Sequence, residues 1–204
     1  MKRLCPYLLA LMLCCQSLNA GGGSFLQRFH PGIEWGFSPM PAEYHHYNYL
    51  DQSIGFRIND KGWSYPCHLN AFILAGVSLD LSTRIDIAVL SGYQGISVQR
   101  RTVPLIGRVS YYFCGKEKDG FLVFGDAGLF LGKNQKYGRQ TEAGAGYMLT
   151  LAPHCSLVFR IGGRVVYDRP DVWDPIEEEY ISARNIKRND AWYYALNLGV
   201  GLYF

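Results

Sequence analysis

The last residues of the chain alternate strictly between two kinds of side chain, and this pattern constrains the fold more than any other feature. From Ala191 to Phe204 every second position is apolar or aromatic, and the positions between are small or polar. A period of two predicts a β-strand. The run is more than twice the ~5–6 residues of an ordinary strand. An apolar band with aromatic residues at both ends is typical of a strand that crosses a membrane in a β-barrel.

The same alternation recurs upstream, so we predict an all-β fold with eight antiparallel strands. Besides 191–204, the expected strands are 32–38, 69–81, 84–94, 102–113, 121–131, 140–151 and 156–167. Charged residues are only 18% of the chain, below the ~25% of soluble proteins, whereas aromatics reach 15% and glycine 23 residues. This composition suits a β-rich protein with an apolar exterior. The net charge of +3 is too small to indicate a nucleic-acid partner.

The connections between the expected strands alternate in length. Short turns are expected at 82–83, 114–120 and 152–155, and longer loops at 39–68, 95–101, 132–139 and 168–190. Membrane barrels have short periplasmic turns and longer outer loops, so we place both termini in the periplasm. Ile54, Phe56 and Ile58 alternate within 39–68. They predict either a hairpin projecting above the membrane or an extra strand pair.

Residues 1–20 have the anatomy of a cleaved signal peptide. Lys2 and Arg3 precede an apolar stretch from Leu4 to Cys15, and a polar region ends at Ala20. A lipoprotein signal with Cys14 or Cys15 as the lipidated residue is the alternative. Residues 21–31 are then expected to be an N-terminal periplasmic segment, and 32–204 the barrel.

Taken together, these features resemble the small eight-stranded outer-membrane β-barrels of Gram-negative bacteria, the OmpX/OmpA-type and "porin family" proteins. The resemblance covers nearly all of 32–204. It implies an up-and-down transmembrane barrel in the outer membrane, in contact with membrane lipid and lipopolysaccharide. The alternating C-terminal residues resemble the family's signal for the barrel-assembly machinery; here they are Trp192, Tyr194, Leu196, Leu198, Val200, Leu202 and Phe204.

Six charged residues fall on the positions that should face the lumen: Glu34, Arg108, Asp126, Glu142, Arg160 and Arg164. Side chains just fill an eight-stranded barrel, and buried charges persist only when they are paired. We therefore expect an ion-pair plug that blocks the lumen, with a narrow gated pore as the alternative. Asp80 and Asp86 are expected to be solvated at the periplasmic end.

Cys114 and Cys155 fall in turns that lie at the same end of neighbouring hairpins. Because the periplasm is oxidising, we predict a disulfide between them, with two free thiols as the alternative. Cys67, at the opposite end, should be unpaired.

Aromatic residues gather in the first long loop, which is the best candidate for a binding surface because Tyr and Trp favour interfaces. They are Tyr44, Tyr47, Tyr49, Trp63 and Tyr65. His45 and His46 lie among them, but adjacent residues of an extended segment point to opposite sides, so we expect no metal site. The acids and bases of 168–190 match no calcium-loop motif and are expected to be solvated.

His154 and Ser156 resemble the His-x-Ser pair of barrel lipid A deacylases, with Asp168 as the nearest acid. Asp168 should lie at the opposite end of the same strand, so no catalytic cluster can form. We expect a non-enzymatic protein without a cofactor, in a structural, surface-binding or accessory role that its outer loops mediate. A larger outer-membrane protein complex is one setting for such a role. The alternatives are a small gated pore, a lipid-modifying enzyme, and a soluble ligand-binding barrel with its charged face outside.

Overall fold

The computed structural model describes residues 28–51, 55–97, 100–131, 138–152, 155–174 and 179–204. The expected signal peptide and its lipoprotein alternative lie outside these residues. No helix in the described part of the chain has the length and hydropathy to cross a bilayer.

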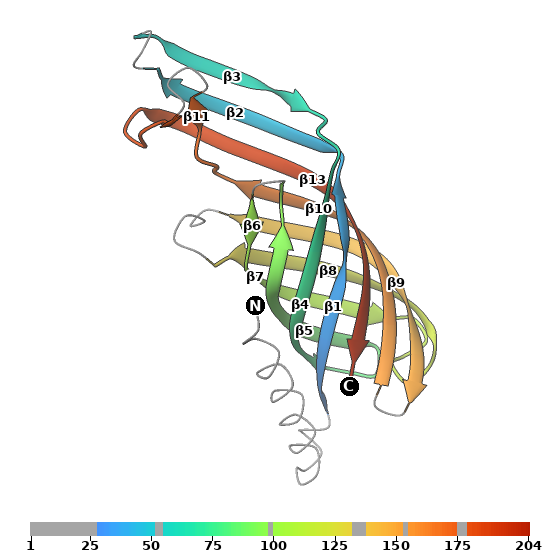
Figure 1. The fold of residues 1–204 in the computed structure, drawn as a ribbon. Coiled ribbons are helices and arrows are strands. Elements are labelled where there is room, and N and C mark those ends of the chain that lie inside the picture. The colour runs from blue at the N-terminus through green and yellow to red at the C-terminus, as the bar shows by residue number, and fades with distance from the viewer. Residues whose placement is uncertain (1–27, 52–54, 98–99, 132–137, 153–154, 175–178) are drawn as a thin grey trace, which may run out of the picture.

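Eight antiparallel strands form a closed barrel, as the alternating segments predict (Figure 1). In barrel order they are β1 (Phe29–Met40), β4 (His68–Asp80), β5 (Ile85–Gly95), β7 (Pro104–Tyr112), β8 (Gly120–Phe130), β9 (Arg139–Ala152), β10 (Cys155–Asp168) and β13 (Ile186–Tyr203). The barrel closes where β1 pairs with β13, from Gly32 opposite Tyr203 to Phe37 opposite Leu198. The expected fold class is therefore confirmed.

Alternation along the strands sorts side chains between the wall's two faces. Large apolar residues such as Phe121, Ile161 and Leu198 are exposed on the outside. The alternate positions of the strands point into the barrel and include Glu34, Arg108 and Asp126, which are buried. The soluble alternative required the reverse orientation and is wrong.

The two ends of the barrel differ. The end that holds the start of β1 and the end of β13 is called the terminal end here, and the other is the loop end. At the loop end the same sheet continues beyond the barrel with two further strands (Figure 1). Strand β2 (Ala42–Leu50) follows β1 after Pro41 and pairs with β13 as far as Ile186, and β3 (Arg57–Ser64) pairs with β2.

We call β2, β3 and Ile186–Asp190 of β13 the extension, because this part of β13 pairs with β2, with a register shift between Ile186 and Arg188, and not with β10. The first long loop thus contains the projecting hairpin, and the barrel keeps eight strands. The 168–190 segment differs from expectation, since its last residues are strand. Short pairings complete the loop end: β6 (Arg101–Thr102) lies on β5, and β11 (Trp173–Asp174) pairs with β12 (Glu179–Tyr180).

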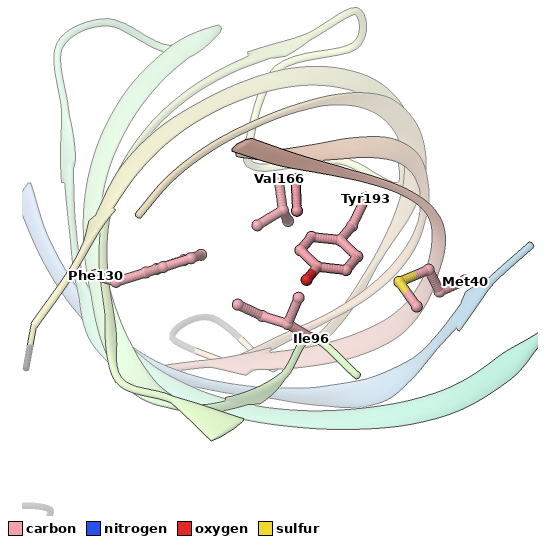
Figure 2. Close-up of a cluster of buried hydrophobic side chains, with 6 residues drawn as sticks. Met40, Ile96, Phe130, Val166 and Tyr193 are labelled. Carbon is pink, nitrogen blue, oxygen red and sulfur yellow. The ribbon is translucent and has the colours of Figure 1, made fainter. Parts of the chain in front are cut away.

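Apolar side chains fill the lumen at three places. One cluster seals the loop end and is shown in Figure 2: Met40, Ile96, Phe130, Val166, Ala191 and Tyr193. A second lies toward the terminal end: Tyr112, Leu122, Phe124, Met148 and Val158, with Tyr203 against it. The third comprises Phe72, Leu74, Leu90 and Ile106. Apart from Ile96, which follows β5, these residues lie at inward positions of the strands. The sequence pattern identified those positions by their small, polar and charged residues and did not predict apolar clusters there.

Cys114 and Cys155 are free thiols, so the predicted disulfide between them is wrong. Gly120, next to Cys114 in its hairpin, pairs with Met148, and β9 continues from there to Ala152, opposite Cys155. Four residues of strand correspond to about 13 Å, whereas the Cα atoms of a disulfide lie within about 7 Å. The longer β9–β10 hairpin carries Cys155 beyond the reach of Cys114. Cys67 is likewise free.

Candidate functional site

The centre of the lumen holds a compact ion cluster around Arg108. Its Nε and Nη2 donate to the two carboxylate oxygens of Asp126, at 2.7 Å each, and its Nη1 donates to Glu34 at 2.5 Å. Arg160 and the Tyr203 hydroxyl also contact Glu34, and Arg160 donates to that hydroxyl at 2.6 Å. Five strands, β1, β7, β8, β10 and β13, thus contribute charges or hydroxyls to one network.

Glu142 and Arg164 lie directly opposite each other on β9 and β10. Glu142 accepts a hydrogen bond from Asn197, and Arg164 donates to the Ser38 hydroxyl at 2.7 Å. All six charged residues expected in the lumen are therefore found there. The cavity that all of them except Arg164 border measures about 20 Å³, room for roughly one water molecule. The cluster therefore fills the centre of the lumen almost completely.

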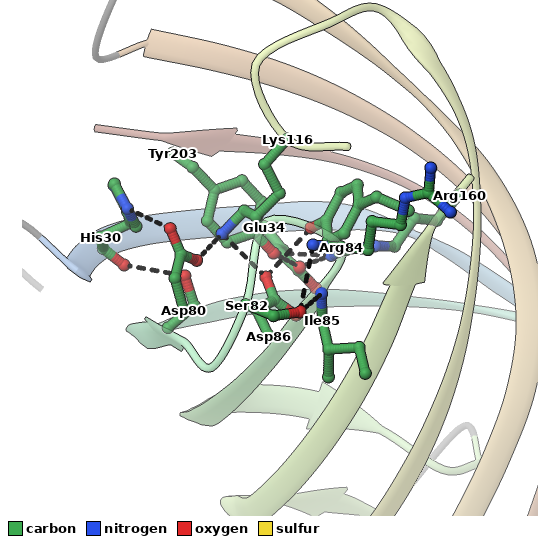
Figure 3. A network of polar contacts seen from close by, with 12 residues as sticks. His30, Glu34, Asp80, Ser82, Arg84, Ile85, Asp86, Lys116, Arg160 and Tyr203 are labelled. Carbon is green, nitrogen blue, oxygen red and sulfur yellow. Dashed lines mark hydrogen bonds and ion pairs between the residues drawn. The ribbon is translucent and has the colours of Figure 1, made fainter. Parts of the chain in front are cut away.

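A second polar network lies at the terminal end, where most of its residues line a cavity of about 450 Å³ (Figure 3). His30 Nε2 lies 2.9 Å from Asp80, and Lys116 contacts both Asp80 and Asp86, the latter at 3.1 Å. The Tyr112 hydroxyl donates to Asp86 at 3.0 Å. Lys116 therefore links the turn between β7 and β8 to β4 and β5, and Asp86 is buried rather than solvated.

The aromatic residues that we expected to form one binding surface lie on two opposite faces of the extension. Tyr44 pairs with Trp63 and Trp192 across the sheet, on the face that continues the outer wall. Tyr47 and Tyr49 alternate with Tyr44 and occupy the opposite face, which continues the lumen side of β13. Tyr65 lies beyond β3 and is 75% exposed. The five aromatics thus form no single surface.

The lumen-side face of the extension combines polar and aromatic groups. His45 stacks on Tyr47, with 5.1 Å between ring centroids, and lies 3.2 Å from Asp60 of β3. Burial raises the pKa of Tyr47 to about 12, and the carboxylate of Glu43 adds to this effect. Tyr47 therefore stays a neutral hydrogen-bonding group at physiological pH. His46 points the other way and contacts Asn59, so the two histidines do not converge, as expected.

The residues of the rejected catalytic cluster lie apart. Ser156 opposes Tyr203 at the terminal end, whereas Asp168 opposes Ala191 at the loop end and forms an ion pair with Arg100. His154 lies outside the described residues. The structure thus places this serine and this acid at opposite ends of β10.

No family model matches this chain. No curated protein matches it either. Among solved structures it is similar to the outer membrane protein OprG from Pseudomonas aeruginosa, at 8% identity and a TM-score of 0.44, over 86% of this chain and 95% of that one. It is also similar to the outer membrane protease OmpT from Escherichia coli, at 9% identity and a TM-score of 0.42, over 86% and 96% of the two chains. A de novo designed transmembrane β-barrel matches at 13% identity and a TM-score of 0.34, over 81% and 97%. The assignment of the fold rests on the strand pairing itself.

Sequence reasoning missed several residues that complete these networks. Lys116 lies in an expected turn, and His30 precedes the first expected strand, so neither belonged to a recognised face. Tyr203 and Asn197 were assigned to the inward face of the last strand but not to the charge cluster. Their inward parity was the available signal, because a polar side chain in a small barrel must meet the charges around it.

Proposed function

We propose that this chain is a non-enzymatic outer-membrane barrel, closed to solutes, that presents its extension to a partner protein at the cell surface. The apolar outer wall supports membrane insertion, because an exposed apolar belt of this extent is unfavourable in water. The long connections at the loop end support an orientation with that end outside and the termini in the periplasm.

The observation that carries the proposal is the continuity of the extension with the barrel wall. Strand β13 pairs with β10 through Ala191 and then with β2 alone through Ile186. A surface held by a backbone ladder is positioned more rigidly than one on a loop, and rigid surfaces lose less entropy on binding. The lumen-side face, with Tyr47, Tyr49 and His45, offers amphipathic rings of the kind that interfaces favour.

The sealed lumen argues against transport. The ion cluster leaves about 20 Å³ at the centre, and the apolar cluster around Phe130 and Tyr193 closes the loop end. A gated pore would need to displace both layers. The pore remains an alternative that bilayer conductance tests directly.

The test is mild-detergent purification of the full chain from its native outer membrane, with mass spectrometry of co-purifying proteins. We expect a stoichiometric companion that is lost in Tyr47→Ala, on the lumen-side face. The matched variant Tyr44→Ala, three residues away on the outer face, should retain it. Heat-dependent gel mobility verifies that each variant is a folded barrel. A wild-type barrel that purifies alone would refute the partner, and recovery from the soluble periplasm would refute the membrane assignment.

A further inference from the structure

One cross-strand row on the outer face marks the boundary between the barrel wall and the extension. From β9 to β3 it contains Arg139, Tyr167, Trp192, Tyr44 and Trp63, each opposite the next in register. The Arg139 guanidinium lies 5.1 Å from the centroid of the Tyr167 ring, which in turn lies 4.9 Å from the centroid of a Trp192 ring. Such rings sit at the level of lipid headgroups, so this row places the membrane surface.

Two more arginines lie directly above this row. Arg169 Nε donates to the Tyr167 hydroxyl at 2.9 Å and contacts Asp190 at 3.1 Å, and Arg188 Nε donates to Asp190 at 2.6 Å. The Asp190 carboxylate holds Arg169 and Arg188 in place. Arg139 lies over the ring of Tyr167, whose hydroxyl donates to the same carboxylate. The three guanidinium groups are thus linked through Tyr167 and Asp190 into one cluster at the headgroup level.

Below the row the outer wall is hollowed. A groove of about 750 Å³ runs over β7, β8 and β9, and Arg139, Tyr167 and Trp192 form part of its lining. Its floor includes Gly107 and Ala127, which oppose each other on β7 and β8. Small residues at outward positions leave space that Leu105 and Leu129 border. A groove of this kind in a bilayer accepts a hydrocarbon chain.

We propose that the groove and the cluster of Arg139, Arg169 and Arg188 form a binding site for lipid A, a glycolipid with several acyl chains and two phosphates. An acyl chain would occupy the groove, and the phosphates would meet the arginines. Guanidinium groups suit phosphate because they donate paired hydrogen bonds in one plane. A cluster of three arginines, of which Arg139 lines the groove, favours a bisphosphorylated lipid over a glycerophospholipid, which carries a single phosphodiester there. The proposal rests on the proposed orientation, with the loop end in the outer leaflet.

The experiment is native mass spectrometry of the delipidated full chain in detergent, titrated with bisphosphorylated lipid A, monophosphorylated lipid A or phosphatidylglycerol. We expect the bisphosphorylated form to bind most tightly. Removal of one guanidinium near an anionic headgroup weakens binding about fivefold, so Arg139→Gln should lower the affinity by that factor. The control Arg84→Gln removes an exposed arginine in the turn between β4 and β5, at the terminal end, and should change nothing.

A second pair of variants tests the groove. Gly107→Leu fills it, and an added Cβ there meets nothing nearer than the Ala127 carbonyl oxygen at 3.9 Å. Gly163→Leu adds the same side chain to the outer face of β10, where a Cβ has no neighbour within 4 Å, outside the groove lining. We expect weaker lipid A binding only for Gly107→Leu.

Equal binding of phosphatidylglycerol, or unchanged affinity in both Arg139→Gln and Gly107→Leu, would overturn the site. Because binding is measured on purified protein, the result is independent of any companion protein. Failure of the partner proposal and failure of this site are therefore distinguishable.

Discussion

Arg108 and Asp126 face each other on β7 and β8 and share two hydrogen bonds of 2.7 Å in the centre of the lumen. Both side chains are almost completely buried. The first prediction follows from this pair, because removal of one partner leaves the other charge buried and unpaired. Asp126→Leu should lower the free energy of unfolding by about 3–5 kcal/mol.

Urea unfolding in detergent, followed by heat-dependent gel mobility, measures this loss. The double variant Arg108→Met with Asp126→Leu should lose less than the sum of the two single variants, because no unpaired partner then remains between them. Additive losses would show that the two residues act independently, in conflict with the observed geometry.

The second prediction concerns a phenylalanine ring that lies over paired glycines. Phe124 packs over Gly144 and Gly162, which oppose each other on β9 and β10. A Cβ added at Gly144 would overlap the Ile161 carbonyl oxygen and lie 2.8 Å from Phe124 Cζ. Gly144→Ala should therefore cost about 1–3 kcal/mol, as overpacking does.

Gly163→Ala is the matched control, since it lies on the outer face of β10 with nothing within 4 Å of an added Cβ. It should change stability by no more than about 0.5 kcal/mol. The same unfolding assay compares the two. A loss of equal size in both variants would attribute the effect to glycine flexibility in general and not to the room that the ring needs.

The third prediction concerns the pH dependence of the extension. Burial raises the pKa of Asp190, but hydrogen bonds from Tyr167 and Arg188 outweigh burial and lower it overall. A carboxyl whose pKa is lowered on folding stabilises the fold above its unfolded pKa of about 3.9. That stabilisation is lost as the pH falls through the folded value.

Hydrogen exchange of the β2 amides tests this, with wild type and Asp190→Asn compared at each pH. At pH 7 we expect faster exchange in the variant, by an amount equivalent to about 1 kcal/mol, because the two arginines are partly exposed. The difference should shrink as the pH falls below the unfolded pKa of about 3.9, and it should vanish once the pH is below the lowered pKa of the folded state. The exposed Asp171→Asn serves as the control, and a difference that persists at low pH would rule out the charge as its source.

The fourth prediction concerns conductance. Arg160 contacts Glu34 in the central cluster, and the apolar cluster with Phe130 and Tyr193 closes the lumen separately at the loop end. In planar bilayers we expect no steady current for the wild type or for Arg160→Ala. The double variant with Phe130→Ala removes bulk from both layers and should conduct. Regular single-channel steps in the wild type would instead support the pore.

Periodicity predicted the barrel because the alternation within each strand shows which of its faces is apolar and which is polar. Strand β10 was expected at 156–167 and spans Cys155–Asp168. The same reasoning placed Arg108 and Asp126 on one face, and their pairing then follows from neighbouring strands. Local alternation is enough for these features, since it depends only on the environment on either side of one strand.

Other features depend on pairings that no local pattern records. Ile186–Asp190 is strand only because β2 lies beside it, and its polar side chains look like a loop in isolation. Cys114 and Cys155 were placed at the same end correctly, but hairpin length decides their separation. The split of Tyr44 from Tyr47 was readable from parity, once the segment was known to be a strand.

Strand β13 is shared by the barrel and the extension, and its pairing with β1 is the seam at which the barrel closes. Any pull on the extension is therefore carried along one continuous backbone into that seam. The hydrogen bonds of the seam would be loaded end to end, in shear, so that many must break together before the chain yields. A force that a partner applies to the extension would thus be shared by the hydrogen bonds along the β1–β13 pairing.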